Sequence, residues 1–239
     1  MTVESKIFIK GDPQWQALRS RFITATEISG LFALNPYSSP AKVYENKIKS
    51  TFSDNVYTRM GRILEPSVLN LAKDVLDIEA GLFAEGGDRI YYSTELGMSA
   101  TPDAFVGTSL ESREALIELK TTSLENARKW AVEPPLYYLA QLAVQSMLTE
   151  TPIGYLVIMH PRYPDLPSLA FKTEYIPEIG DIMTSEVARF RDHFFGPSKA
   201  TQVYRVDRKK CMRLRELLLK NITVVHNSVT LERPVFNWD

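Results

Sequence analysis

The chain has 239 residues, of which 44% are hydrophobic and 24% are charged, and its formal net charge is −1. This composition is typical of a globular protein with a sizeable core, so it excludes wholesale disorder and a surface uniformly basic for non-specific DNA binding. No run approaches about 18 consecutive apolar residues, the N-terminus lacks a secretory signal pattern, and Cys211 is the single cysteine. We therefore expect a cytoplasmic protein without membrane spans, disulfides or cysteine-held metal.

Sequence patterning predicts a single α/β domain over residues 1–239, without repeats or long linkers. Apolar spacing and capping signals predict helices over residues 13–20, 40–49, 54–76, 124–131, 136–149, 179–195 and 208–219. The capping-box spacing of Thr24 and Glu27 predicts one more helix start, and Pro66 predicts a kink or break in the helix over residues 54–76. β-rich runs predict strands at 89–92, 98–106, 115–120, 153–159 and 169–176, the first three as an antiparallel meander. Together these elements describe helices packed on a central mixed β-sheet.

Two acidic residues and a lysine lie on consecutive predicted strands. Asp103 is followed fifteen residues later by Glu118, and Lys120 lies two residues further on. Residues two apart in a strand point to one face, so Glu118 and Lys120 should project together, and a hairpin would bring Asp103 beside Glu118. Neighbouring carboxylates repel one another unless a cation lies between them, and Mg²⁺ suits such oxygen ligands. With a lysine to orient or deprotonate water, or to stabilise phosphate charge, this group can hydrolyse a phosphodiester.

The alternative is an ordinary exposed strand face with Asp103 in a turn, because a glutamate and a lysine two residues apart are common. The apolar neighbours Leu116, Ile117 and Leu119 favour a buried strand instead. On these residues alone both interpretations remain open.

A wider set of segments resembles a known nuclease family. The order of an aspartate followed by Glu-x-Lys resembles the PD-(D/E)xK superfamily, which has a restriction-endonuclease-like core. Further segments are similar to its lambda-exonuclease-like branch, the alkaline exonucleases also described as YqaJ-type viral recombinases. The segments are Gly11–Trp15 with Leu18–Arg19, Ile23–Glu27, Gly61–Pro66, Thr101–Asp103, Ile117–Lys120 and Tyr138–Gln141. The resemblance covers roughly residues 11 to 150.

The resemblance implies a metal site and a catalytic lysine. Asp103 and Glu118, with the backbone carbonyl of Leu119, would ligate Mg²⁺, for which Mn²⁺ is expected to substitute. Lys120 would act on the attacking water.

The resemblance also implies two supporting residues. Glu65 would hold a second metal or its water, and the alternative makes it a surface helix residue. Gln141 would orient a water or Lys120, and Gln145 is the rival one turn later on the same helix face. Either glutamine can instead merely satisfy a buried polar group.

In this family an arginine and nearby hydroxyls bind the 5′-terminal phosphate of the digested strand, which implies this role for Arg19, Thr26 and Thr101. A guanidinium grips a phosphate through two parallel hydrogen bonds. Both threonines stand where serine is more usual. The family's second arginine has no clear match, since Asn126 falls near its spacing and Arg128 two residues later. Alternatively, Arg19 forms an ion pair on an amphipathic helix.

The implied activity is Mg²⁺-dependent 5′-to-3′ digestion of duplex DNA from its ends. The resemblance further implies a homotrimeric ring around the DNA and a single-strand-annealing protein as partner in phage-type recombination. An endonuclease or nicking repair nuclease of the same superfamily is one alternative, and a non-catalytic DNA-binding module is another.

Two further groups of residues have open roles. Basic residues between Arg205 and Lys220 indicate the solvated face of a helix or a DNA-tracking surface. Trp130, Tyr137 and Tyr138 suit base stacking or the core, and the core is the more frequent place for aromatics beside apolar residues.

Overall fold

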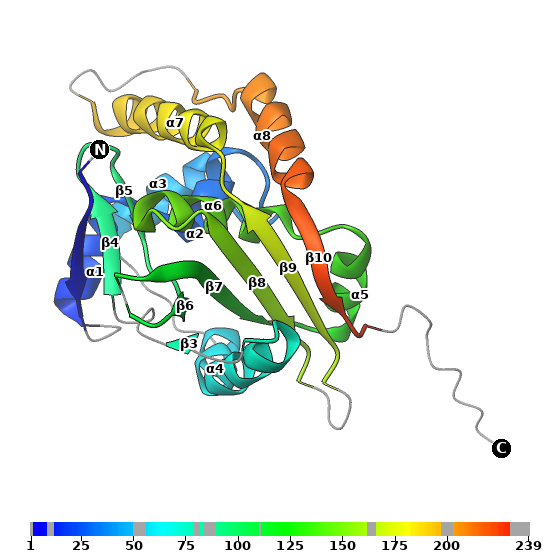
Figure 1. Ribbon diagram of the computed structural model, residues 1–239. Helices are drawn as coiled ribbons and strands as arrows, with labels where there is room; N and C mark the ends of the chain where they lie inside the picture. Colours follow the sequence, from blue (N-terminus) through cyan, green and yellow to red (C-terminus); the bar gives the residue numbers. More distant parts are fainter. Residues whose placement is uncertain are drawn as a thin grey trace.

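The described residues form two β-sheets with helices packed on them (Figure 1). The computed structural model describes residues 2–8, 12–49, 56–78, 82–83, 89–109, 111–161, 166–196 and 203–229, so Gly11 and residues 54–55 of the predicted segments lie outside it. The helices are α1 (Pro13–Arg21), α2 (Ala25–Leu31), α3 (Pro40–Lys49), α4 (Val56–Val75), α5 (Leu124–Val132), α6 (Leu136–Thr149), α7 (Pro177–Phe195) and α8 (Arg208–Lys220). The strands are β1 (Glu4–Ile7), β2 (Ile23–Thr24), β3 (Leu82–Phe83), β4 (Arg89–Ser93), β5 (Met98–Ala100), β6 (Ala104–Gly107), β7 (Arg113–Thr121), β8 (Ile153–Met159), β9 (Ser168–Glu174) and β10 (Ile222–Asn227).

The larger sheet has the strand order β10-β9-β8-β7-β6-β3, and the smaller sheet has the order β1-β4-β5-β2. In the larger sheet β7 and β8 are parallel and the other neighbours are antiparallel, so the predicted mixed sheet is confirmed. Parallel neighbours need a crossover connection, which α5 and α6 provide between β7 and β8. The sequence does not predict β1, β2, β3 or β10, because short and edge strands depend on pairing with distant segments.

Residues 98–106 form two strands in different sheets, so the prediction of one continuous strand was wrong. β5 ends at Ala100 in the smaller sheet, and β6 begins at Ala104 in the larger sheet. Pro102 lies between them, and proline has no N–H for a ladder hydrogen bond. The chain therefore changes sheets at residues 101–103. The predicted meander is divided accordingly, with β4 and β5 paired in one sheet and β6 and β7 in the other.

Helices cover both faces of the larger sheet (Figure 1). On one face Leu142 of α6 is buried with Leu116 of β7. On the other face Val68 of α4 is buried with Ile117 of β7. Because both faces of β7 are covered, Glu118 is only 1% exposed. An ordinary exposed strand face is therefore excluded for Glu118.

Two helix signals in the sequence had different outcomes. The predicted capping box at the start of α2 is present, with the Glu27 carboxylate accepting hydrogen bonds from the N–H and hydroxyl of Thr24, each at 2.9 Å. The predicted break at Pro66 is absent, because α4 continues through it as one helix of 20 residues. Pro66 supplies no N–H for the carbonyl four residues earlier, but this single lost hydrogen bond does not end the helix.

Three basic residues of α8, Lys210, Arg213 and Arg215, pair with acidic residues. Arg213 binds Glu178 at 2.7 Å, and Arg215 binds Glu133 at 2.7 Å. The opposite side of the helix buries Leu214, Leu217 and Leu218. Met212 is 73% exposed and does not share that apolar side. These pairs favour the solvated face of a helix over a DNA-tracking surface.

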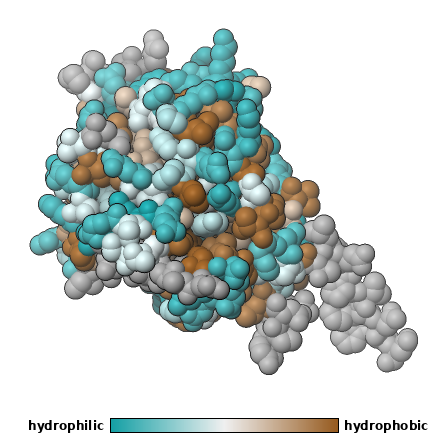
Figure 2. All heavy atoms as spheres, viewed as in Figure 1, coloured by the Kyte–Doolittle hydropathy of each residue, from teal (hydrophilic) through white to brown (hydrophobic). Residues whose placement is uncertain are grey.

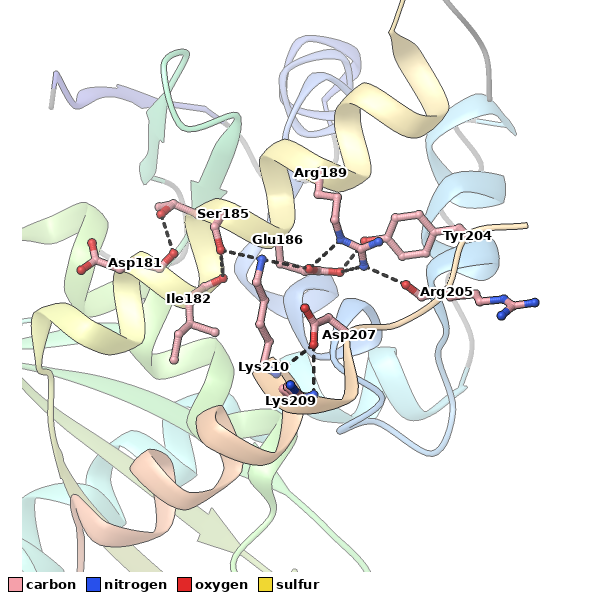
Figure 3. A network of polar contacts seen from close by, with 11 residues as sticks. Asp181, Ile182, Ser185, Glu186, Arg189, Tyr204, Arg205, Asp207, Lys209 and Lys210 are labelled. Atoms are coloured by element: carbon pink, nitrogen blue, oxygen red, sulfur yellow. Dashed lines mark hydrogen bonds and ion pairs between the residues drawn. The ribbon is translucent and has the colours of Figure 1, made fainter. Parts of the chain in front are cut away.

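A buried carboxylate joins α7 to α8 and to the segment before α8 (Figure 3). Glu186 of α7 is 1% exposed. It accepts hydrogen bonds from Nε of Arg189 at 3.0 Å and from the Tyr204 hydroxyl at 2.5 Å. Lys210 of α8 lies 3.6 Å from the same carboxylate, and Arg189 also donates to the Arg205 carbonyl at 2.9 Å. The network therefore holds α8 and the preceding segment against α7.

Glu186→Gln should lower the free energy of unfolding by about 2 kcal/mol, because it removes the charge that compensates two cations and leaves them poorly paired. Glu133→Gln is the matched control, since its pair with Arg215 is exposed at 66% and 53%. We expect the control to change stability by less than about 0.5 kcal/mol. Urea denaturation of both variants measures the difference, and equal losses would contradict a special role for the buried network.

The surface visible in Figure 2 is mostly hydrophilic, with hydrophobic residues exposed in several separate places. At the edge strand β10, for example, Val224 and Val225 are 53% and 42% exposed. Within the described part of the chain, no helix combines the length and apolar character that crossing a membrane requires.

Candidate active site

The corner between β5 and β6 brings Asp103 to the edge of β7. β6 and β7 are antiparallel with Ala104 opposite Ile117, so the residue before Ala104 lies beside the next residues of β7. The Leu119 N–H donates a hydrogen bond to Oδ2 of Asp103 at 2.8 Å. This bond anchors the Asp103 carboxylate just before β6 begins, next to Glu118.

Glu118 is enclosed by three donors from β7 and α6. Lys120, two residues along β7, pairs with Oε1 of Glu118. Gln141 and Gln145 lie one turn apart on α6, and their Nε2 atoms donate to Oε1 at 2.5 Å and to Oε2 at 2.6 Å. The sequence offers the two glutamines as alternatives, and the structure brings both to Glu118.

The side-chain oxygens of Gln141 and Gln145 are buried and have no hydrogen-bond partner among the described residues. A buried amide oxygen without a donor costs about 1–3 kcal/mol. The amide nitrogens are held by Glu118, so the side chains cannot simply turn to satisfy their oxygens. Two free acceptors beside a carboxyl pair indicate a site that water completes.

The charges of the site are not balanced by the described residues alone. Burial, followed by the charge of Glu118, raises the pKa of Asp103 to about 7, although Lys120 opposes the shift. Burial would lower the pKa of Lys120, but the charges of Glu118 and Asp103 outweigh it and raise that pKa. Lys120 is therefore protonated at neutral pH. When both carboxyls are ionised, one ammonium leaves a net negative charge that a further cation can neutralise.

The donor set fits a divalent metal ion. Oδ1 of Asp103 and one lone pair on Oε2 of Glu118 remain open after the hydrogen bonds of the described residues are assigned. The Leu119 carbonyl faces the same edge of β7 as the Leu119 N–H, because both groups of a strand residue face one neighbour. In the described ranges no three His, Cys, Asp or Glu side chains gather as a metal site. Two carboxylates and a carbonyl suit Mg²⁺, which keeps several of its waters.

Glu65 approaches the site from a different element. It lies on α4, which covers the face of β7 opposite to that of Glu118. Its charge contributes to the raised pKa of Asp103, after burial and the charge of Glu118. Its side chain is half-buried, so Glu65 is not a fully exposed surface residue of the helix.

The two threonines expected at a phosphate site lie at matching ends of neighbouring strands. β2 and β5 are parallel, with Thr24 opposite Ser99, so Thr26 and Thr101 both follow the carboxyl ends of these strands. The Thr101 carbonyl accepts a hydrogen bond from Nε2 of Gln145 at 3.4 Å. Because Gln145 also binds Glu118, this bond connects the threonine corner to the carboxyl pair.

Arg19 belongs to a partly buried group of two cations and one carboxylate. Its guanidinium lies 4.4 Å from the centre of the Trp15 ring, and burial lowers its pKa against the charge of Glu27. Lys47 of α3 has a side chain that is 7% exposed, and it pairs with Glu27 at 2.5 Å. Lys47 also donates to the Arg19 carbonyl at 3.0 Å. Glu27 forms its ion pair with Lys47 and acts on Arg19 only through its charge, so the Arg19 guanidinium can bind a further anion.

Sequence reasoning missed two contacts of this region. The Lys120 ammonium lies 5.2 Å from the centre of the Tyr138 ring. Tyr138 precedes Gln141 by three residues, so helical spacing contains a signal for its position on the same face. Lys47 has no comparable signal, because its partners belong to other helices.

Comparisons with known proteins find one matching family and several similar structures. The sequence matches the family described as YqaJ-like viral recombinase domain over residues 14–152. A comparison with curated proteins finds no significant match. Among solved structures, the chain is similar to the alkaline exonuclease LHK-Exo from Laribacter hongkongensis, with 20% identity, 87% of this chain and 99% of that chain covered, and a TM-score of 0.59. The same exonuclease in complex with dAMP gives 19% identity, 87% and 97% coverage, and a TM-score of 0.56.

A phage-related exonuclease from Haemophilus somnus 129PT is also similar, with 14% identity, 74% of this chain and 96% of that chain covered, and a TM-score of 0.52. These likenesses show a shared fold, the PD-(D/E)xK core in which helices flank a mixed sheet. The family match extends over more than half of the 239 residues. The chain therefore belongs to the YqaJ-like viral recombinase domain family.

Proposed function

We propose that this protein is a metal-dependent deoxyribonuclease that digests linear duplex DNA from its ends in the 5′-to-3′ direction. The observation that carries the proposal is the convergence of two carboxylates and a protonated lysine at one edge of β7, from Asp103, Glu118 and Lys120. Family membership and the exonuclease names of the similar structures support it.

Asp103, Glu118 and the Leu119 carbonyl are proposed to hold Mg²⁺, for which Mn²⁺ substitutes, and Glu65 adds acidic charge. When bound, the ion supplies Lewis acidity to a scissile phosphate and lowers the pKa of water. Lys120 would act on the attacking water, by orienting or deprotonating it, or would stabilise charge that develops on the phosphate.

Gln141 and Gln145 have a supporting role in this proposal. Their amide nitrogens fix both oxygens of Glu118, and their free oxygens accept hydrogen bonds from water. The two amides thus position the carboxylate without carrying charge themselves.

We place the 5′-terminal phosphate of the digested strand near Arg19, Thr26 and Thr101. The excess positive charge around Arg19 and the shared end of β2 and β5 support this placement. Arg19 binds the phosphate through charge-assisted hydrogen bonds, and the threonine hydroxyls add neutral ones.

The remaining parts of the proposal concern assembly. A homotrimeric ring reconciles a net charge of −1 with DNA binding, because basic residues need only line its channel. A single-strand-annealing protein would coat the strand that resection exposes, and the reaction would take place in the cytoplasm.

The test incubates the purified protein with Mg²⁺ and linear duplexes that carry or lack a 5′-phosphate, each labelled at either end. We expect products that shorten progressively from the 5′ end, faster with the 5′-phosphate, and no hydrolysis in EDTA. Closed circular DNA is the control, and its cleavage would show an endonuclease instead. Absence of hydrolysis with either Mg²⁺ or Mn²⁺ would contradict the proposal.

A further inference from the structure

A pocket of about 530 Å³ lies where the end of α6, the start of α7 and the turn between β4 and β5 meet. Its apolar lining comes from Leu96, Met147, Pro152 and Pro177. Tyr138, at the start of α6, adjoins Lys120, whereas the pocket lies at the other end of that helix. The pocket is therefore separate from the candidate active site, and the proposed nuclease chemistry does not use it.

Tyr175 shapes the pocket by reaching from the end of β9 to α7. Its hydroxyl lies over Gly180 of α7, where an added Cβ would meet that hydroxyl at 2.0 Å and the sulfur of Met147 at 3.2 Å. The Tyr175 N–H donates to the Pro152 carbonyl at 2.8 Å, which fixes the backbone of the tyrosine. The walls are therefore set by packing between α6, α7 and the end of β9.

Two hydroxyl groups that line the pocket have no hydrogen-bond partner. Ser146 of α6 is only 2% exposed, and its side chain forms no hydrogen bond with any residue that the structure describes. The same holds for the hydroxyl of the half-buried Tyr175. Buried polar groups are normally paired, so these hydroxyls indicate a site that a ligand completes.

Two carboxylates of the pocket are also unpaired. Glu150 and Asp181 form no ion pair and no side-chain hydrogen bond within the described ranges. The Asp181 carboxylate points away from the network around Glu186 (Figure 3). Arg191 packs against Gly97 in the turn between β4 and β5 and pairs with neither carboxylate. The pocket therefore has negative charge that the surrounding residues leave unpaired.

Glu150 holds its place in a backbone conformation that favours glycine. It follows α6 with φ 55° and ψ 32°, in the left-handed region, and its N–H donates to the Ser146 carbonyl. Glycine or asparagine is usual at such a helix end, because a Cβ is strained there. Strain of this kind persists most often at functional sites, which supports a role for the Glu150 side chain.

We propose that this pocket binds a primary ammonium group on an apolar stem, carried by a free alkylamine or by a lysine side chain of a partner protein. The carboxylates of Glu150 and Asp181 attract the positive charge. An ammonium has three N–H donors, and the hydroxyl oxygens of Ser146 and Tyr175 can accept from them. The apolar lining covers the stem, as it does for the methylene groups of a lysine. The inference does not depend on the proposed nuclease function.

The test titrates hexylamine into protein that carries carbon-13 in its methionine methyl groups and follows the methyl NMR signals. Hexanol has the same stem without the charge, and we expect it to bind at least about tenfold more weakly. The signal of Met147, which lines the pocket, should shift, and that of Met212, outside the pocket and 73% exposed, should not. Nα-acetyl-lysine methylamide is the second amine. If it binds as well as hexylamine, the source is a side chain, and if only hexylamine binds, the source is a free amine.

Glu150→Gly and Asp181→Asn should each weaken the binding of hexylamine by about tenfold, because each removes one carboxylate. Glycine suits the left-handed backbone at residue 150, so Glu150→Gly keeps the fold. Glu133→Gln is the matched control, since it removes an exposed carboxylate outside the pocket and should bind hexylamine as the wild-type protein does.

Three results would overturn the ammonium pocket. They are equal binding of hexylamine and hexanol, unchanged binding in both carboxylate variants, and no shift of the Met147 signal with either amine. Because the readout is binding in the absence of DNA, each of these results leaves the proposed nuclease function standing.

Discussion

Asp103→Asn is expected to lower the rate of DNA hydrolysis by about 10²- to 10³-fold or more, because it removes half of the charge that would hold the metal ion. Asparagine keeps an oxygen that can accept the Leu119 N–H, so the hydrogen bond that anchors the sheet corner survives. The same substitution should raise the free energy of unfolding of the metal-free protein at pH 8 by about 2 kcal/mol, since it removes a buried negative charge beside Glu118. Opposite effects on activity and stability distinguish a functional carboxylate from a structural one.

Hydrolysis of end-labelled duplex DNA and urea denaturation in EDTA measure the two effects.

Lys120→Met should lower the rate of DNA hydrolysis by roughly 10²- to 10⁴-fold. Lys172→Met is its matched control, because Lys172 lies in the same sheet and pairs with Glu174 at 3.3 Å on an accessible surface. The control should keep the wild-type rate. If Asp103→Asn also kept it, the carboxyl pair would not be the active site.

The stability of the metal-free protein should fall as the pH rises from about 4 to 7, because of Asp103. Its pKa is raised from 3.8 to about 7 in the folded protein. Between these values the unfolded chain has lost the proton and the folded chain still holds it, so the folded state binds more protons. Each pH unit in this window therefore costs the folded state at most about 1.4 kcal/mol, and the loss is complete about one unit above the folded-state pKa.

The measurement follows the difference in unfolding free energy between the wild-type protein and Asp103→Asn, in EDTA, from pH 4 to 8. This difference removes the contribution of other titrating groups. Adding Mg²⁺ at pH 8 should stabilise the wild-type protein, by about 2.7 kcal/mol at a hundred times the dissociation constant, and should have little effect on the variant. A pH-independent difference, or an equal effect of Mg²⁺ on both proteins, would contradict a carboxyl pair that shares a metal ion.

Sequence patterns were sufficient to predict the elements whose signals come from residues close together in the chain. The capping box of Thr24 and Glu27 and the apolar spacing of α6 depend on residues within a few positions of one another. The separation of Asp103 from the Glu118–Lys120 pair likewise predicts a hairpin contact, which the β6–β7 register produces. The β5–β6 corner was not predicted, because a short strand with a central proline reads as one segment until its partner strands are known.

By itself, the sequence determined the chemical types at the site and their order, since an acid, a second acid and a lysine at that spacing limit the reactions available. Only the tertiary structure decided which distant groups surround them. The convergence of Gln141 and Gln145 on Glu118, and the pairing of Glu27 with Lys47, arise from packing between elements that are distant in the sequence. Burial also decided the charge states, because the raised pKa of Asp103 comes first from desolvation, which no spacing of residues along a chain encodes.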